Sequence, residues 1–139
     1  MNKSRWCYAS LLIVLILLLT ACEGGFTATG SSERSHITSN SGWFEKSIKR
    51  ANGSTTLKIE IERPGRRLET NVTLEAGEGT FRIELLDGES NVTLSLEATP
   101  GRPASGSGLM TTDSFGDARY RVTAVEAKDV KYRIEFDIK

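Results

Sequence analysis

The sequence predicts an all-β protein, a two-sheet antiparallel β-sandwich of jelly-roll-like form with seven or eight strands. Three observations carry this prediction. Beyond residue 42, apolar and charged residues alternate with a period of two, as expected when one face of a strand packs on a core and the other meets water. Turn residues separate the alternating segments. Beyond the N-terminal apolar run, no segment has the periodicity of a helix.

The N-terminal segment resembles the end of a bacterial lipoprotein signal peptide. Lys3 and Arg5 precede an apolar run over residues 11–19, and Leu19-Thr20-Ala21-Cys22 has the residue order of a lipobox. The run is shorter than the roughly 20 apolar residues that a membrane-spanning helix needs. The resemblance implies that residues 1–21 are a signal peptide and that Cys22 becomes a lipidated first residue. The anchored chain would then lie on the extracytoplasmic face of a cell membrane, either plasma or outer.

Removal of this signal peptide changes the chemistry of the chain. All 18 acidic residues remain, whereas Lys3 and Arg5 leave from a total of 18 basic residues, so the mature formal charge is −2. Nucleic acid is therefore not an expected partner, because proteins that bind it carry a basic excess. Cys7 also leaves, and the sulfur of Cys22 would be blocked by lipid. No disulfide and no thiol nucleophile are then expected.

Residues 22–42 are predicted to be a flexible tether between the lipid and the folded domain. The segment is rich in Gly, Ser and Thr, and a coil of this length has an r.m.s. span of about 25 Å. His36, the only histidine of the chain, lies in it. One histidine on a flexible segment cannot fix the geometry of a metal site or a catalytic base.

The domain itself is predicted to cover residues 43–139 and to begin with a hairpin. Residues 55–63 alternate apolar and charged side chains, and the segment 43–50 before them is aromatic at its start. Asn52-Gly53 lies between the two segments, and both of these residues tolerate positive φ. We therefore expect two antiparallel strands joined by a tight turn.

The rest of the domain repeats the alternation. Pro100 and Pro103 open a longer loop that is expected to continue to Gly108, because proline is excluded from the interior of a sheet. The side chains expected to face the core are Val72 and Leu74, then Phe81, Ile83 and Leu85, then Val92, Leu94 and Leu96, then Tyr120, Val122 and Ala124, and finally Tyr132, Ile134, Phe136 and Ile138.

The domain contains, in order, an aromatic first strand, a central stretch at residues 79–89 with an Asp-Gly turn, and closing stretches at residues 116–122 and 132–136. This order resembles small bacterial surface lipoproteins with jelly-roll domains, and it is similar in outline to pre-peptidase C-terminal and GOLD-type domains. The resemblance covers about residues 43–138. It implies a non-enzymatic accessory module.

Motifs for catalysis and metal binding are not apparent in the sequence. A serine nucleophile needs a base, and the single histidine lies outside the predicted domain. Cysteine and histidine do not cluster with zinc spacing. Asp113 and Asp117 offer too few oxygens for calcium, so the segment is interpreted as a plain loop. No cofactor or metal is expected, and the protein is not expected to be an enzyme.

Two features are candidate ligand contacts. Trp43 is expected to bury its ring over the end of the sandwich, although an exposed ring could stack on a sugar. Arg63, Arg66 and Arg67, with Arg50, are candidates for a basic edge toward lipid headgroups or anionic polymers. Their acidic neighbours favour a mixed, salt-bridged surface instead.

The expected function is that of a lipid-anchored binding or structural module at the bacterial cell envelope. Its partners would be the membrane, through lipidated Cys22, and an envelope protein or glycan that the sequence does not identify. A carbohydrate-binding module is the alternative, and an enzyme is the third. Exposed aromatic residues on a sheet face would favour the hypothesis of a carbohydrate-binding module, and converging carboxylates in a cleft would favour catalysis.

Overall fold

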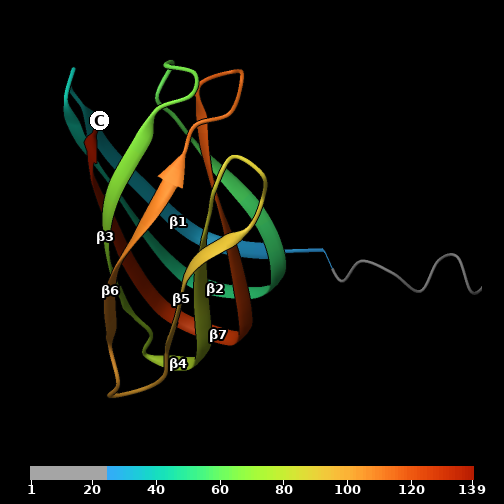
Figure 1. Cartoon of the computed structure of the whole chain (residues 1–139). Helices are drawn as coiled ribbons and strands as arrows, with labels where there is room; N and C mark the ends of the chain where they lie inside the picture. Colours follow the sequence, from blue (N-terminus) through green and yellow to red (C-terminus); the bar gives the residue numbers. More distant parts are fainter. Residues whose placement is uncertain (1–24) are drawn as a thin grey trace, which may run out of the picture.

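The computed structural model describes residues 25–139, and strands are the regular elements of this part of the chain (Figure 1). Over these residues no helix has the length and apolar character needed to cross a membrane. The all-β class is confirmed. The strands are β1 (Thr27–Ile37), β2 (Ser41–Glu60), β3 (Arg67–Glu75), β4 (Glu78–Leu86), β5 (Val92–Ala98), β6 (Ala104–Thr111) and β7 (Asp117–Ile138).

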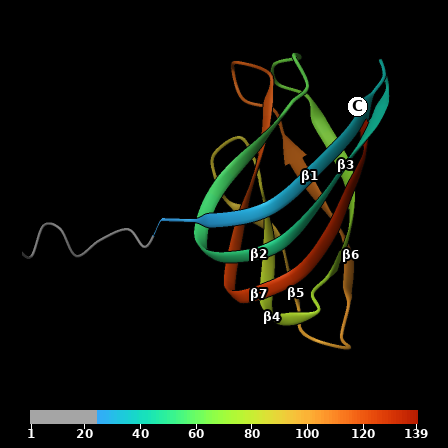
Figure 2. The same cartoon turned by 180° about the vertical axis from the view of Figure 1, so that it is seen from behind.

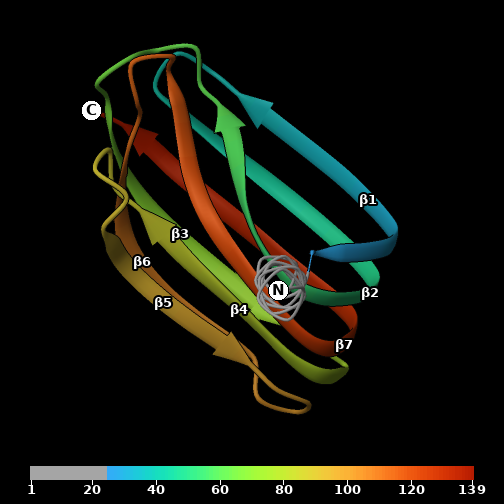
Figure 3. The same cartoon turned by 90° about the vertical axis from the view of Figure 1, so that its right-hand side faces the viewer.

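Two long strands, β2 and β7, organise the fold. They pair antiparallel along nearly their whole lengths, from Ser41 opposite Asp137 to Glu60 opposite Asp117. Both strands bend at mid-length and turn back, as Figure 3 shows at its lower right. Each strand therefore contributes one half to each of two layers.

The two layers form an antiparallel β-sandwich. The five-stranded layer contains β1, residues 41–51 of β2, residues 127–138 of β7, β3 and β6, in that order. The four-stranded layer contains residues 53–60 of β2, residues 117–125 of β7, β4 and β5. Because β2 and β7 run through both, one hydrogen-bonded network folds over on itself to make the sandwich.

This folding gives the molecule two different ends. The bend end carries the bends of β2 and β7 together with the β3–β4 turn and the β5–β6 loop. The open end carries the other loops and the C-terminus (Figure 1). The open-end segments are residues 38–40, 61–66, 87–91 and 112–116. Backbone hydrogen bonds connect residues 61–66 with residues 112–116, and Asn40 with Ile138 of β7.

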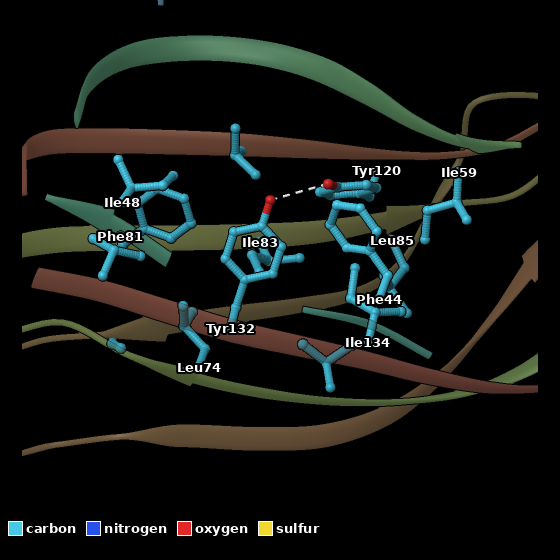
Figure 4. Close-up of a cluster of buried hydrophobic side chains, with 14 of the residues drawn as sticks. Phe44, Ile48, Ile59, Leu74, Phe81, Ile83, Leu85, Tyr120, Tyr132 and Ile134 are labelled. Atoms are coloured by element: carbon cyan, nitrogen blue, oxygen red, sulfur yellow. Dashed lines mark hydrogen bonds between the residues drawn. The ribbon is translucent and has the colours of Figure 1, made fainter. Parts of the chain in front are cut away.

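Aromatic side chains lie at the centre of the core between the layers (Figure 4). Phe81 stacks on Tyr132 with ring centroids 5.8 Å apart, and Tyr120 meets Tyr132 edge-on at 6.0 Å. The two tyrosines come from opposite halves of β7, and their hydroxyls share a buried hydrogen bond of 3.0 Å. A single bent strand thus joins both layers through its own side chains.

The alternation identified most of this core. The predicted inward residues of β3, β4 and β7 are buried, apart from the partly buried Ile138. Strand β5 differs, because Leu94 and Leu96 are only partly buried and Val92 is 46% exposed. This strand lies at the edge of its layer, where the sandwich covers less of each side chain.

The prediction of a tether over residues 22–42 is wrong for the part that the structure describes. Residues 27–37 form β1 and pair with β2 from Thr27 opposite Asn52 to Ile37 opposite Gly42. Every residue of β1 is exposed, because the four-stranded layer has no strand opposite it. Backbone hydrogen bonds to β2 hold this strand, together with side-chain contacts such as the Glu33–Lys46 ion pair. Because its side chains are all exposed, they carry no pattern of burial for the sequence to reveal.

The predicted hairpin at Asn52-Gly53 is also wrong. Strand β2 continues through these residues, and its register with β7 shifts between Ala51 and Gly53. Gly53 has a φ of 97°, and the Asn52 side-chain oxygen accepts a hydrogen bond from the backbone N–H of Glu126. The residue pair therefore makes a bulge at the bend, which uses the same positive φ as a turn.

The predicted loop up to Gly108 is a strand instead from Ala104 onward. Strand β6 pairs with β3 over Ala104–Thr111. A Cβ atom at Gly108 would lie 2.7 Å from the Cβ of Leu94, and one at Gly106 would lie 3.1 Å from Leu96. The glycines of β6 thus admit the leucines of β5 between the layers, so here glycine indicates close packing.

Candidate functional site

The outward face of the five-stranded layer gathers polar and aromatic side chains in rows across its strands. Figure 2 shows β1 and β2 of this layer side by side. Side chains of directly paired residues point to the same face of a sheet. One row crosses all five strands and consists of His36, Trp43, Glu135, Asn71 and Ser107. We call this surface the outer face.

Trp43 and Arg133 form the centre of the outer face. The guanidinium carbon of Arg133 lies 4.4 Å from the centroid of the Trp43 ring, within the range of a cation–π contact. The same guanidinium donates to Glu135 Oε1 at 2.6 Å and to Glu45 Oε2 at 3.5 Å. The hydrogen bond with Glu135, followed by that with Glu45, raises the pKa of Arg133 above its ordinary value.

This geometry corrects the expected position of Trp43. Its neighbour Phe44 points into the core, whereas Trp43 is only half-buried and lies on the outer face. The ring belongs to a strand interior and not to the end of the sandwich, because Trp43 pairs on both sides, with His36 and Glu135. Trp43 is therefore a partly accessible aromatic side chain held in place by a cation.

Shallow hollows adjoin this pair on the outer face. One, of about 220 Å³, is lined by residues that include His36, Trp43, Asn71, Glu135 and Asp137. Another, of about 310 Å³, lies on the other side of Arg133 beside Thr73 and Ser105. The hollows offer hydroxyl, amide, imidazole and carboxylate groups beside an aromatic ring, a set of groups suited to a ligand with many hydroxyls.

The structure separates the arginines of the predicted basic edge. Arg63, Arg66 and Arg67 lie at the open end, where Arg63 Nη1 donates to the carbonyl oxygen of Ser39. Arg50 lies at the bend end, next to Ala51. The sequence-predicted arginines therefore form no single patch.

The loop at residues 112–116 is braced by side-chain hydrogen bonds and presents an exposed aromatic ring. Asp113 Oδ1 accepts the backbone N–H groups of Phe115 and Asp117 at 2.9 and 3.0 Å. These hydrogen bonds, that of Asp117 first, lower the pKa of Asp113. The Phe115 side chain stands at the tip of this loop and the residue is 83% exposed. No pattern in the sequence singles out Phe115.

The described residues contain no group of three or more histidine, cysteine or acidic side chains placed to hold a metal ion. The two carboxylates considered for calcium have other partners. Asp113 braces its own loop, and Asp117 Oδ2 lies 3.1 Å from Lys58 Nζ. Cys22 and the lipobox lie outside the described residues, so lipid attachment stays a prediction.

The sequence pattern indicated Trp43 as a candidate ligand contact, but it did not indicate the charged residues beside it. Arg133, Glu135 and Glu45 were each consistent with an ordinary solvated strand face. Only the register of β7 on β2 brings them together, because Glu45 and Arg133 are 88 residues apart in sequence. The strict alternation of β7 predicted that these side chains point outward, but not which strand lies beside them.

No family model matches this chain, and no curated protein matches it. The resemblance to pre-peptidase C-terminal and GOLD-type domains therefore stays a prediction.

Several solved structures are similar at low identity. The CBM22-1 xylan-binding domain of Paenibacillus barcinonensis Xyn10C is 14% identical over 83% of this chain and 85% of its own, with a TM-score of 0.40. Peruvianin-I, a cysteine peptidase from Thevetia peruviana latex, is 11% identical over 86% and 68%, with a TM-score of 0.46. The CBM6cm-2 carbohydrate-binding module of Cellvibrio mixtus lichenase 5A, in complex with cellotriose, is 10% identical over 84% and 98%, with a TM-score of 0.37. At these scores none of them decides what this chain binds.

Proposed function

We propose that this chain is a lipid-anchored, non-enzymatic module of the bacterial cell envelope that binds glycans on its outer face. The observation that carries the glycan part is the half-buried Trp43 stacked with Arg133 within a row of polar side chains. A sugar has apolar C–H faces that suit an aromatic ring and hydroxyls that suit paired donors and acceptors. The surroundings of Trp43 offer both.

The anchor part of the proposal rests on the lipobox at residues 19–22. Gly25 forms a β-bridge with Ser54 beside the bend of β2, and Phe26 packs against the core. Three residues from Cys22 to Gly25 can span at most about 10 Å. A lipid on Cys22 would therefore hold the bend end close to the bilayer, in contrast to the 25 Å coil expected from composition.

Intrinsic fluorescence offers a direct test of glycan binding. Trp43 is the only tryptophan after residue 22, since the other one is Trp6. Titration with xylan, cellulose and uronic-acid oligosaccharides should change its emission, and affinity electrophoresis in gels containing the same polysaccharides should show retardation. Trp43→Ala should abolish retardation, whereas Phe115→Ala, which removes an exposed ring from the open end, should leave it unchanged. Equal retardation of both variants would contradict the proposal.

The anchor has a separate test. Cys22→Ala should block lipid attachment, so the precursor should keep its signal peptide and accumulate uncleaved. Mass spectrometry of the purified protein distinguishes the lipidated from the unlipidated form. Normal cleavage and detergent partitioning of this variant would contradict the anchor without affecting the glycan proposal.

A second candidate function is protein binding at the open end, and the exposure of Phe115 favours it. An exposed aromatic side chain on a loop fixed by hydrogen bonds loses little entropy on binding and is a typical interface anchor. Cross-linking on intact cells should recover a partner with wild-type protein and not with Phe115→Ala. Trp43→Ala should keep that partner.

A further inference from the structure

A small basic hollow lies on the outer face beside the proposed glycan site. Its volume is about 180 Å³, and its lining residues are Ser32, Arg34, Glu45, Ser47 and Lys131. Since one water occupies roughly 30 Å³ in the liquid, the hollow has room for a group of a few heavy atoms. Two cations and two hydroxyls thus surround a space of that size.

The register of three strands explains why these side chains meet. Ser32 of β1 pairs with Ser47 of β2, and Ser47 pairs with Lys131 of β7. Arg34 lies one pleat further along β1, on the same face. Neighbouring strands are roughly 4.8 Å apart, so long arginine and lysine side chains on β1 and β7 can both reach a group seated above Ser47.

The two cations are not neutralised by ion pairs with the described residues. Neither Arg34 nor Lys131 has a carboxylate within 4.0 Å there, although ten such ion-pair contacts occur in this part of the chain. Glu45 is the one acidic residue in the lining, and its Oε2 is already 3.5 Å from Arg133 Nη1. The hollow is therefore a basic spot on a mature chain with a slight acidic excess.

We infer that this hollow binds the anionic group of an acidic glycan, a carboxylate or a phosphate. Arginine and lysine hydrogen-bond to such groups through charged donors, and the two serine hydroxyls supply further donors. Trp43 lies four residues from Ser47 on β2, roughly 13 Å away, with Arg133 on the neighbouring strand. A sugar chain that contacts Trp43 can therefore place an acidic substituent in the hollow. The subsite rests on the proposed function, because it belongs to the same face.

The test compares an acidic with a neutral oligosaccharide on the full mature protein in detergent. Isothermal titration should show hexagalacturonate binding at least about tenfold more tightly than xylohexaose at low salt. Raising the ionic strength from about 0.02 to 0.5 M should remove most of this preference, because salt screens exposed charges. Inorganic phosphate should be added as a competitor. Displacement of hexagalacturonate assigns the hollow to phosphate as well as carboxylate, and lack of displacement assigns it to carboxylate.

Single-charge variants locate the effect. Arg34→Gln and Lys131→Gln should each weaken hexagalacturonate binding about tenfold, as expected for the loss of one charge-assisted hydrogen bond, and leave xylohexaose binding unchanged. Lys49→Gln removes the same charge from β2 outside the hollow and should change neither affinity by more than about twofold. Unchanged melting temperatures would verify that the variants fold.

The outcomes separate this subsite from the proposed function. If both oligosaccharides bind equally and the Arg34 and Lys131 variants behave like wild type, the subsite is wrong, but the proposal that the outer face binds glycans is unaffected. If Trp43→Ala has no effect and neither oligosaccharide binds, the proposed function fails together with the subsite.

Discussion

At the scale of single residues, the hydrogen bond between the Tyr120 and Tyr132 hydroxyls constrains how the core packs. Tyr120 and Tyr132 are each about 1% exposed, and their hydroxyls are hydrogen-bonded to each other. Burial raises the pKa of both phenols above the ordinary value of 10.0. Each hydroxyl therefore has the other as its hydrogen-bond partner, because both side chains are almost completely buried.

Removing one hydroxyl should cost more than removing both. Tyr120→Phe leaves the Tyr132 hydroxyl buried without its partner, and we expect a loss of about 1 to 3 kcal/mol. The double change Tyr120→Phe with Tyr132→Phe removes both polar groups and should cost less than the sum of the single changes. Urea unfolding of the four proteins gives the free energies. Additive losses would show that the hydroxyls do not depend on each other.

The same pair makes stability sensitive to alkaline pH. Because the folded state raises the pKa of both phenols, their contribution to stability is fully present below about pH 10 and is lost as the pH rises above it. The third tyrosine of the chain, Tyr8, lies in the predicted signal peptide, so the ultraviolet absorbance of tyrosinate reports on these two residues in the mature protein. Their ionisation should coincide with unfolding. The double phenylalanine variant should unfold at higher pH.

At the scale of elements, the bend of β7 passes very close to the backbone of β4. Gly79 of β4 has a φ of 65°, and a Cβ atom there would lie 2.3 Å from the Glu126 carbonyl oxygen and 2.4 Å from that of Val125. Glu126 and Asp129 at the bend also have positive φ, of 45° and 50°. The bend thus combines an unusual backbone with the absence of a side chain on the strand beside it.

Gly79→Ala should therefore be severely destabilising, by more than about 3 kcal/mol, because the backbone of β7 has to move. Gly101→Ala is a matched control, since Gly101 has a similar φ of 71° but nothing within 4 Å of the added Cβ. This control should cost only the strain of the left-handed conformation, about 1 to 2 kcal/mol. Thermal unfolding of both variants compares the two contributions. Equal losses would mean that the close approach is relieved without cost.

The elements also show what the sequence can and cannot predict. Alternation identified the buried residues of β3, β4 and β7, because burial on one face leaves a period of two. It did not identify β1, whose side chains are all exposed, or β6, whose small residues fit under leucines. It also divided β2 and β7 at their bends. The seven strands fall within the predicted seven or eight because two kinds of error cancel. Strands β1 and β6 were not predicted, and β2 and β7 were each predicted as two separate strands.

The candidate site, like the fold, could be predicted from the sequence only in part. An aromatic residue at position 43 was visible in the sequence, and the outward direction of Arg133 followed from the alternation of β7. Their contact depends on strand order and register, which come from pairings between residues far apart in the chain. The basic hollow required β1 as well, a strand without any apolar pattern. Polar sites on sheet faces are therefore harder to predict than the core beneath them.

At the scale of the whole molecule, the position of the first described residues relative to the two ends would set the orientation of a chain anchored through Cys22. Gly25 is paired beside the bend of β2, whereas Phe115 stands at the open end. Residues 117–125 of β7 connect the two ends as an extended strand of about 30 Å. If Cys22 is lipidated, the bend end lies near the headgroups and the open end points away from the bilayer.

Single cysteines can report this orientation, because the mature chain has no other free thiol once Cys22 carries lipid. Val125 at the bend is 57% exposed and Phe115 is 83% exposed, so Val125→Cys and Phe115→Cys should both accept a fluorophore without disturbing the core. On vesicles that contain headgroup-labelled quencher lipids, we expect strong quenching at position 125 and little at position 115.

A variant with about 20 Gly and Ser residues inserted after Cys22 is the control, since a coil of that length spans about 25 Å and allows the domain to reorient. The quenching difference should then shrink. Equal quenching at both positions in the uninserted protein, with lipidation verified by mass spectrometry, would show that the short connection does not orient the domain.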